Sequence, residues 1–294
     1  MAADNHIRNP FEMAVSGLGG AVSDAGRAMA HARPRTAATV EAPAIRRIGA
    51  ADLMDALRRG AADVGAARGD VFFIALIYPL AGLLIAAAMF EARLTPLIFP
   101  LVAGFALLGP LAAVGLYEIS RRRERGEPIT ASTPLAVLRS PAIGDVLRLG
   151  ALLVAIFFAW LVAAWAIYAA TLGPEPPATV AAFAGEALTT PAGWSMIVIG
   201  IAVGALFAAV VFVLSVISFP LLIDRGVPMS TAVQASVRAV KANPGTMFMW
   251  GLIIAGLLVL GSLPALIGLV FVMPLLGHAT WHLYRKVTGE APAA

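Results

Sequence analysis

Two histidines near the C-terminus, His278 and His282, are four residues apart and therefore lie on one face of the helix predicted there. Such a pair can bind one divalent metal ion from one side, but it cannot supply both axial ligands of a single haem, which approach from opposite sides. Further metal ligands would come from Glu118 or Asp224, which are predicted near the same membrane interface. The simpler interpretation is that both histidines are interfacial residues bonded to water, lipid headgroups or backbone.

Glu118 and Asp224 are acidic residues where two predicted membrane spans reach the cytoplasm, and each has arginines beside it. Arg121 and Arg122 follow Glu118, and Arg225 follows Asp224. Ion pairs that fix helix ends are the structural interpretation. The functional alternative is a small polar mouth on the cytoplasmic side.

Four arginines, Arg121, Arg122, Arg123 and Arg125, form a basic segment directly after a predicted span. A cation near an anionic leaflet gains about 1 kcal/mol, so this segment predicts contact with lipid headgroups. A specific protein partner is the alternative.

The residue types that most enzymes require are scarce. The chain has no cysteine and four histidines, which excludes thiolate nucleophiles, Cys-ligated zinc and iron–sulfur clusters. It contains no HExxH motif, no P-loop and no assignable Ser-His-Asp set. No Asp, Glu, Lys or Arg lies in the middle of a predicted span, whereas ion-coupled transporters usually carry one there. We therefore predict no catalytic residue, no cofactor and no enzymatic activity.

The composition is that of an integral membrane protein. Hydrophobic residues make up 60% of the 294 residues and charged residues only 13%, against about 25% charged residues in soluble proteins. These values exclude a soluble globular domain, a disordered protein and a coiled coil. The net charge of +4 does not indicate nucleic-acid binding, because the cations follow the membrane topology.

Six apolar segments are long enough to cross a bilayer, which needs about 20 apolar residues. They predict an all-α, polytopic helical bundle of six transmembrane helices in three hairpins. The segments are residues 71–90, 94–117, 147–171, 194–223, 246–261 and about 264–284. Of the 21 Lys and Arg residues, all but Arg93 fall on one predicted side of the membrane, so both termini are predicted to be cytoplasmic.

Each hairpin is preceded by a cytoplasmic stretch with helical character. Residues 51–64 carry apolar side chains on one face, a second stretch begins at Thr133 and Pro134 with Leu135 and Leu138, and a third begins near Ser230. Residues 1–47 are predicted to be a disordered tail, 48–287 the membrane domain with its interfacial helices, and 288–294 a short tail.

Three stretches carry a resemblance to a known family: residues 115–126 (GLYEISRRRERG), 219–225 (FPLLIDR) and 274–285 (PLLGHATWHLYR). Over residues 45–287 the chain resembles a family of predicted bacterial integral membrane proteins classed as a domain of unknown function. The resemblance implies a six-helix protein of the bacterial inner membrane and no established activity. Some family members are labelled cytochrome c oxidase subunit I. That subunit needs about six histidine ligands, and this chain has two histidines near its spans, so the label does not fit.

Three functions remain open. The first is a non-enzymatic scaffold, assembly or accessory component of an inner-membrane complex, which contacts lipids and a partner protein or a second copy. The second is a transporter or permeability protein for a neutral or lipid-like solute. The third is a metal- or haem-binding protein that uses His278 and His282.

Overall fold

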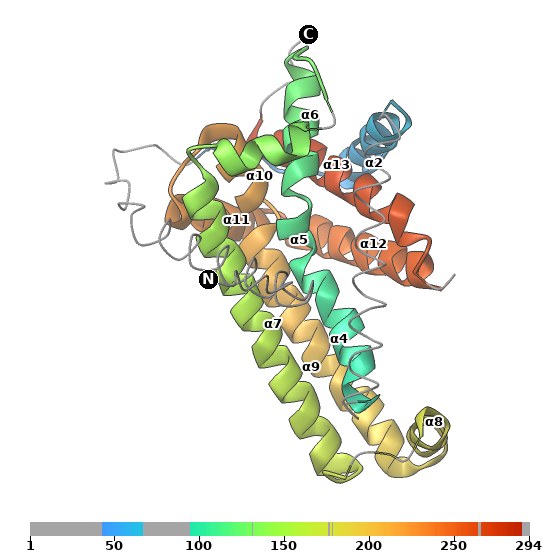
Figure 1. Ribbon diagram of the computed structural model, residues 1–294. Helices are drawn as coiled ribbons and strands as arrows, with labels where there is room; N and C mark the ends of the chain where they lie inside the picture. Colours follow the sequence, from blue (N-terminus) through green and yellow to red (C-terminus); the bar gives the residue numbers. More distant parts are fainter. Residues whose placement is uncertain are drawn as a thin grey trace, which may run out of the picture. The chain divides into compact units, whose positions relative to one another are not determined.

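Every regular element in the described part of the chain is helical, because apolar and alanine-rich sequence leaves few turn signals inside the segments. The computed structural model describes residues 43–66, 95–130, 132–175, 177, 179–263 and 266–289, all within the unit Val40–Ala294 (Figure 1). The first predicted span and residues 1–42 of the predicted tail lie outside these residues. The α-helices are α2 (Ala50–Gly65), α4 (Ile98–Phe105), α5 (Gly109–Ala112), α6 (Val114–Glu124), α7 (Ile143–Thr171), α8 (Val180–Thr189), α9 (Pro191–Ser215), α10 (Ser218–Arg225), α11 (Met229–Ala242), α12 (Pro244–Ser262) and α13 (Leu269–Thr288). The 3₁₀ helices are η1 (Thr95–Leu97), η2 (Ala106–Leu108) and η3 (Thr133–Arg139).

Four helical segments among the described residues are long and apolar enough to cross a membrane. They are Ile98–Glu124, Ile143–Thr171, Pro191–Arg225 and Pro244–Ser262, and they correspond to the second to fifth predicted spans. The most apolar of them, Pro191–Arg225, buries the smallest share of its residues inside the protein. Exposed apolar side chains suit lipid chains and would be costly in water, so the all-α membrane bundle is confirmed.

The segment Ile98–Glu124 is not one continuous α-helix. The 3₁₀ turn η2 separates α4 from α5, and Pro110, which lacks a backbone N–H, occupies the first turn of α5. Trp160 of α7 packs against α4 and donates from Nε1 to the carbonyl oxygen of Pro100 at 2.8 Å. A Cβ at Gly104 would lie 2.7 Å from the Trp160 ring, so glycine permits this approach.

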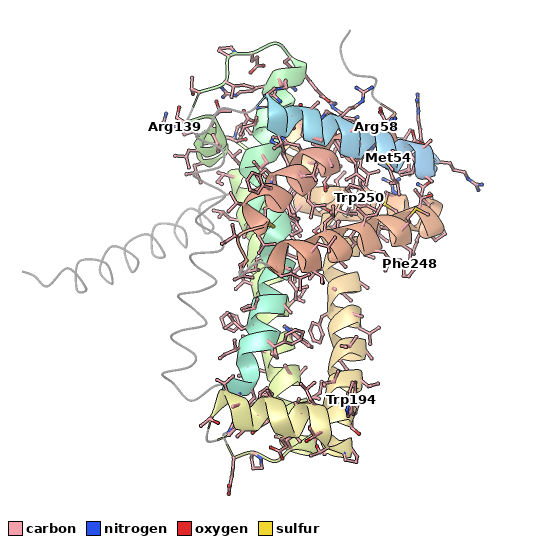
Figure 2. All side chains as sticks on the ribbon, turned by 90° about the vertical axis from the view of Figure 1, so that its right-hand side faces the viewer. Met54, Arg58, Arg139, Trp194, Phe248 and Trp250 are labelled. Atoms are coloured by element: carbon pink, nitrogen blue, oxygen red, sulfur yellow. The ribbon has the colours of Figure 1, made fainter. Side chains whose placement is uncertain are left out.

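The helices α7 and α9 run side by side, joined by the segment that contains α8 (Figure 1). Residues 172–193 form the long predicted external loop, and α8 within them was not predicted. Thr179 begins α8 by accepting from the N–H of Ala182 at 3.0 Å, which is a standard N-cap. Trp194 at the start of α9 donates to the carbonyl oxygen of Leu188 at 3.0 Å (Figure 2).

The predicted cytoplasmic helices differ in outcome. The first is α2 and the third is α11, as predicted, and Pro244 after α11 begins α12. The second is the 3₁₀ helix η3, which buries Val137 and leaves Leu135 and Leu138 exposed. A 3₁₀ helix has three residues per turn, so its side chains follow a different pattern from an α-helix.

The predicted sixth span corresponds to α13, whose C-terminal half is polar and buried inside the protein. Its 20 residues are not among the four long apolar segments. The most extensive contact between two described elements joins α13 to α2. A Cβ at Gly60 of α2 would lie 2.7 Å from the backbone nitrogen of Ala279, so the two helices approach closely at this glycine.

Candidate functional site

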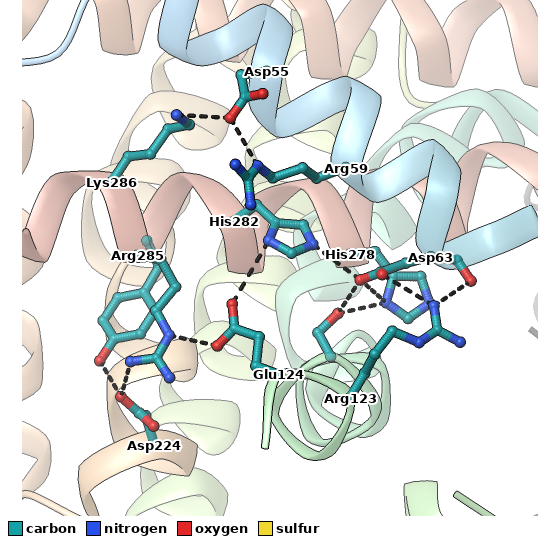
Figure 3. Close-up of polar contacts among 12 residues, drawn as sticks. Asp55, Arg59, Asp63, Arg123, Glu124, Asp224, His278, His282, Arg285 and Lys286 are labelled. Atoms are coloured by element: carbon teal, nitrogen blue, oxygen red, sulfur yellow. Dashed lines mark hydrogen bonds and ion pairs between the residues drawn. The ribbon is translucent and has the colours of Figure 1, made fainter. Parts of the chain in front are cut away.

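Polar side chains from α2, α6 and α13 meet in one buried group, which we call the histidine cluster (Figure 3). Both predicted histidines belong to it: His278 is fully buried and His282 is 8% exposed. The cluster comprises Asp63, Ser120, Arg123, Glu124, His278 and His282. The i, i+4 spacing on α13 turns both imidazoles toward α2 and α6.

Asp63 is the centre of the cluster. Its Oδ2 lies 3.0 Å from Nε2 of His282 and 3.7 Å from Nδ1 of His278, and Ser120 donates to the same oxygen at 2.9 Å. Arg123 donates to Oδ1 at 3.0 Å and to the backbone carbonyl of Asp63 at 2.8 Å. The second bond satisfies one of the carbonyls left without a partner at the C-terminal end of α2.

The hydrogen bonds of Ser120 define the proton on His278. Ser120 Oγ lies 2.7 Å from Nδ1 of His278, and its single hydroxyl hydrogen goes to Asp63. Nδ1 of His278 must therefore carry a hydrogen and donate to Ser120. Nε2 of His278 is then an acceptor in the neutral ring, and it is buried without a hydrogen-bond partner among the described residues.

The environment of Asp63 favours its ionised form. Burial works to raise the pKa of this carboxyl group, but hydrogen bonds from His282 and Arg123, with smaller electrostatic contributions from the nearby imidazoles, lower the pKa to about 2. Asp63 is thus a buried carboxylate that carries its charge at neutral pH. Its stabilising partners come from α6 and α13.

A second group of charges, the arginine branch, extends the histidine cluster toward α10. Arg285 donates to Glu124 at 2.8 Å and to Asp224 at 3.1 Å. Tyr284 donates to Asp224 at 2.7 Å, and Arg125 pairs with the other oxygen of Asp224 at 3.4 Å. Nδ1 of His282 lies 3.8 Å from Glu124, which links the two groups (Figure 3).

The two acidic residues predicted to form a polar mouth, Glu118 and Asp224, lie in separate groups of ion pairs. Glu118, with its side chain 4% exposed, pairs with Arg121 at 2.7 Å and with Arg122 at 2.8 Å, as i+3 and i+4 neighbours on one helix can. Asp224 instead pairs with Arg125, directly after α6, and with Tyr284 and Arg285 of α13. The sequence suggested Arg225 as the partner of Asp224. The structure adds partners that are far from Asp224 in sequence.

Sequence reasoning missed five members of these groups: Asp63, Ser120, Glu124, Tyr284 and Arg285. Asp63 carried a detectable signal, because it shares a helical face with the buried Ala56 and Gly60 of α2. An acidic residue on the apolar face of an amphipathic helix needs a partner in the protein. Ser120, Glu124 and Arg285 lie among other polar residues and gave no comparable signal.

The cluster is built for ion pairing. No group of three His, Asp or Glu side chains that could hold a metal ion occurs in the part of the chain that the structure describes. Glu118 and Asp224, the additional ligands suggested by the sequence, are engaged with arginines. The nearest carboxylate to both histidines is Asp63, and it is shared with Arg123.

Comparison with known proteins finds one family model that matches part of the chain. No curated protein and no solved structure matches the chain. The family match covers α6 and α10 of the site but neither α2 nor α13, so it is narrower than the resemblance over residues 45–287. Residues 98–224, which run from α4 to Asp224 of α10, match the model of a family described as Predicted integral membrane protein (DUF2189).

Proposed function

We propose that this integral membrane protein is a non-enzymatic scaffold, assembly or accessory component of a bacterial inner-membrane complex. One observation supports this proposal above the others: the charged groups of the histidine cluster and the arginine branch are paired with one another. They join α2, α6, α10 and α13. Buried pairs of this kind hold helices in register, whereas a catalytic site must present at least one such group to a substrate.

The positions of the cations support a cytoplasmic location for this paired region. The positive-inside rule assigns the segments that carry 20 of the 21 Lys and Arg residues to the cytoplasm. The C-terminal end of α6 and the middle of α2 carry basic residues of these segments. On this assignment the ion pairs form a rigid cytoplasmic layer at the ends of the spans, and both termini are cytoplasmic.

Co-purification tests the scaffold role. The full chain with a C-terminal tag is extracted from native membranes in a mild detergent, and its companions are identified and counted by mass spectrometry. We expect a stoichiometric membrane-protein partner or a second copy of the chain. Recovery of a monomer without companions, or turnover of a defined substrate by the pure protein, would contradict the proposal.

A matched pair of variants connects the partner to the paired layer. Asp63→Asn removes a buried charge of the histidine cluster, while Asp55→Asn on the same helix removes an exposed one. We expect the partner to be reduced in the first preparation and retained in the second. Equal recovery in both would show that the layer does not support the interaction.

A second function, transport of a neutral or lipid-like solute, is favoured by the interrupted segment Ile98–Glu124. The turn η2 lies between α4 and α5 and contacts both α7 and α9, and interrupted spans line substrate paths in many transporters. Liposome flux over a panel of neutral solutes tests this alternative. Flux that depends on the protein would favour transport over scaffolding.

A further inference from the structure

The arginines predicted to contact lipid headgroups have partners inside the protein. Arg121 and Arg122 face Glu118, and Arg123 and Arg125 face carboxylates of α2 and α10. These pairs cancel much of the field that would attract an anionic headgroup. A headgroup site with more net positive charge than these paired arginines must therefore use other cations of the protein.

Four other cations, which we call the basic corner, lie on two segments that meet at the start of α12: Arg46 and Arg47 precede α2, and Arg238 and Lys241 belong to α11. All four are exposed, and no carboxylate of the described residues pairs with any of them. Arg238 and Lys241 occupy the exposed side of α11, whose opposite side buries Ala235 and Ala239. The helical period thus turns both charges outward.

Asn243 holds the two halves of the basic corner together. Its side chain accepts from the N–H of Ile48 at 2.8 Å and donates to the carbonyl oxygen of Arg46 at 3.0 Å. The hydroxyl of Thr246 donates to the carbonyl oxygen of Ile48 at 3.0 Å. These bonds span about 200 positions of sequence and place the backbone of residues 46–48 beside the end of α11 that carries Lys241. The guanidinium of Arg46 itself lies against Gly289 at the end of α13.

Exposed apolar side chains begin directly after the basic corner. Pro244 starts α12, one of the four long apolar segments, and the next turns expose Phe248 by 69% and Leu252 by 56%. Figure 2 shows Phe248 on the outer side of α12. The N-terminal end of a helix also carries a partial positive charge. Positive charge therefore meets an apolar surface at the start of a span.

We propose that the basic corner binds the headgroup of an anionic phospholipid, with the acyl chains of that lipid along the exposed side of α12. The four cations attract the phosphate, and Phe248 and Leu252 contact the chains. The surface changes from charged at the basic corner to apolar along α12, in the same order as a phospholipid changes from headgroup to acyl chains. The carboxylates of neighbouring α2, Asp52 and Asp55, are already paired with Lys286.

Native mass spectrometry of the full chain in a mild detergent tests the site, with phosphatidylglycerol and phosphatidylcholine as probes. A cation near an anionic surface gains about 1 kcal/mol, which corresponds to about five-fold in affinity. We expect the double variant Arg238→Gln, Lys241→Gln to lose about 25-fold in phosphatidylglycerol affinity. The matched control, Arg58→Gln with Arg139→Gln, removes two exposed cations elsewhere (Figure 2) and should keep the wild-type value.

Two further measurements distinguish a lipid from a free phosphate. Phe248→Ser should weaken phosphatidylglycerol binding, and glycerol phosphate should compete only at far higher concentration than the lipid. Equal affinity for the two lipids, or an equal loss in the control variant, would overturn the proposal. Competition by glycerol phosphate at the lipid's own concentration would also overturn it, since the ligand would then be a soluble phosphate.

Discussion

Replacing Asp63 by asparagine removes the negative charge at the centre of the histidine cluster while nearly preserving the shape of the side chain. The pKa of Asp63 falls from its ordinary value of 3.8 to about 2 in the folded protein. Each pKa unit corresponds to about 1.4 kcal/mol, so the ionised group stabilises the folded state by roughly 2–3 kcal/mol at neutral pH. Asp63→Asn should lose most of this contribution.

The loss should appear first in α2. Asp63 ties this helix to His282 of α13 and to Arg123 of α6. A loss of roughly 2–3 kcal/mol corresponds to an increase of roughly 30- to 150-fold in local opening. Hydrogen exchange of the detergent-solubilised protein, followed by mass spectrometry of peptides from α2, measures this opening directly.

Asp55→Asn is the control for this experiment. Asp55 is on the same helix and pairs with Arg59 and Lys286 at 2.8 Å, but its side chain is 40% exposed. An exposed pair contributes at most about 1 kcal/mol, so exchange in α2 should rise only a few-fold. Equal exchange rates in the two variants would refute the assignment of Asp63 as a buried ionic tie.

Three further predictions follow from the same region. Because the folded pKa of Asp63 lies below its ordinary value, its contribution to stability is present above about pH 4 and is lost as the pH falls toward 2. Over that range α2 of the wild type should lose protection from hydrogen exchange, and α2 of Asp63→Asn should lose much less. Gly60→Ala should destabilise the docking of α2 by roughly 1–3 kcal/mol, because its Cβ would meet the α13 backbone at 2.7 Å, whereas Gly65→Ala has open space and should be neutral or stabilising in thermal unfolding. Metal analysis by plasma mass spectrometry should give equal metal content for the wild type and the double variant His278→Ala, His282→Ala; a lower content in the variant would establish the metal-binding alternative.

The sequence was sufficient for the long apolar helices because span length and hydrophobicity are local properties. The second to fifth predicted spans agree with the described helices to within a few residues at most ends. The interruption at η2 and the 3₁₀ character of η3 were not predicted, since proline and glycine mark a break without fixing its geometry.

The candidate site was predicted only in part because its contacts join segments far apart in the chain. The pairing of His282 with Asp63 spans 219 positions, and that of Arg285 with Glu124 spans 161. A single sequence does not show which residues so far apart in the chain come into contact. It identified His278 and His282 as a pair on one helical face near the membrane interface, and it offered Glu118 and Asp224 as further ligands if the pair binds a metal. The helical face of α2 that carries Asp63 was the signal that could have corrected this.

A buried ionic cluster in so apolar a protein requires a reason other than stability, because well-packed hydrophobic replacements of buried ion pairs are often as stable as the pairs themselves. We interpret the cluster as the device that fixes the register of α2 on α13. Apolar contacts alone would permit α2 to shift along α13. The hydrogen bond between His282 and Asp63 forms in only one register of the two helices. The combined variant Asp63→Leu, Arg123→Met, His282→Leu, which removes Asp63 together with both of its charged partners, should therefore retain thermal stability but dock in several registers. Since the chain has no cysteine, single cysteine pairs introduced into α2 and α13 can report the register by disulfide trapping. One trapped pair in the wild type and several in the variant are expected; a single pair in both would mean that packing at Gly60 sets the register by itself.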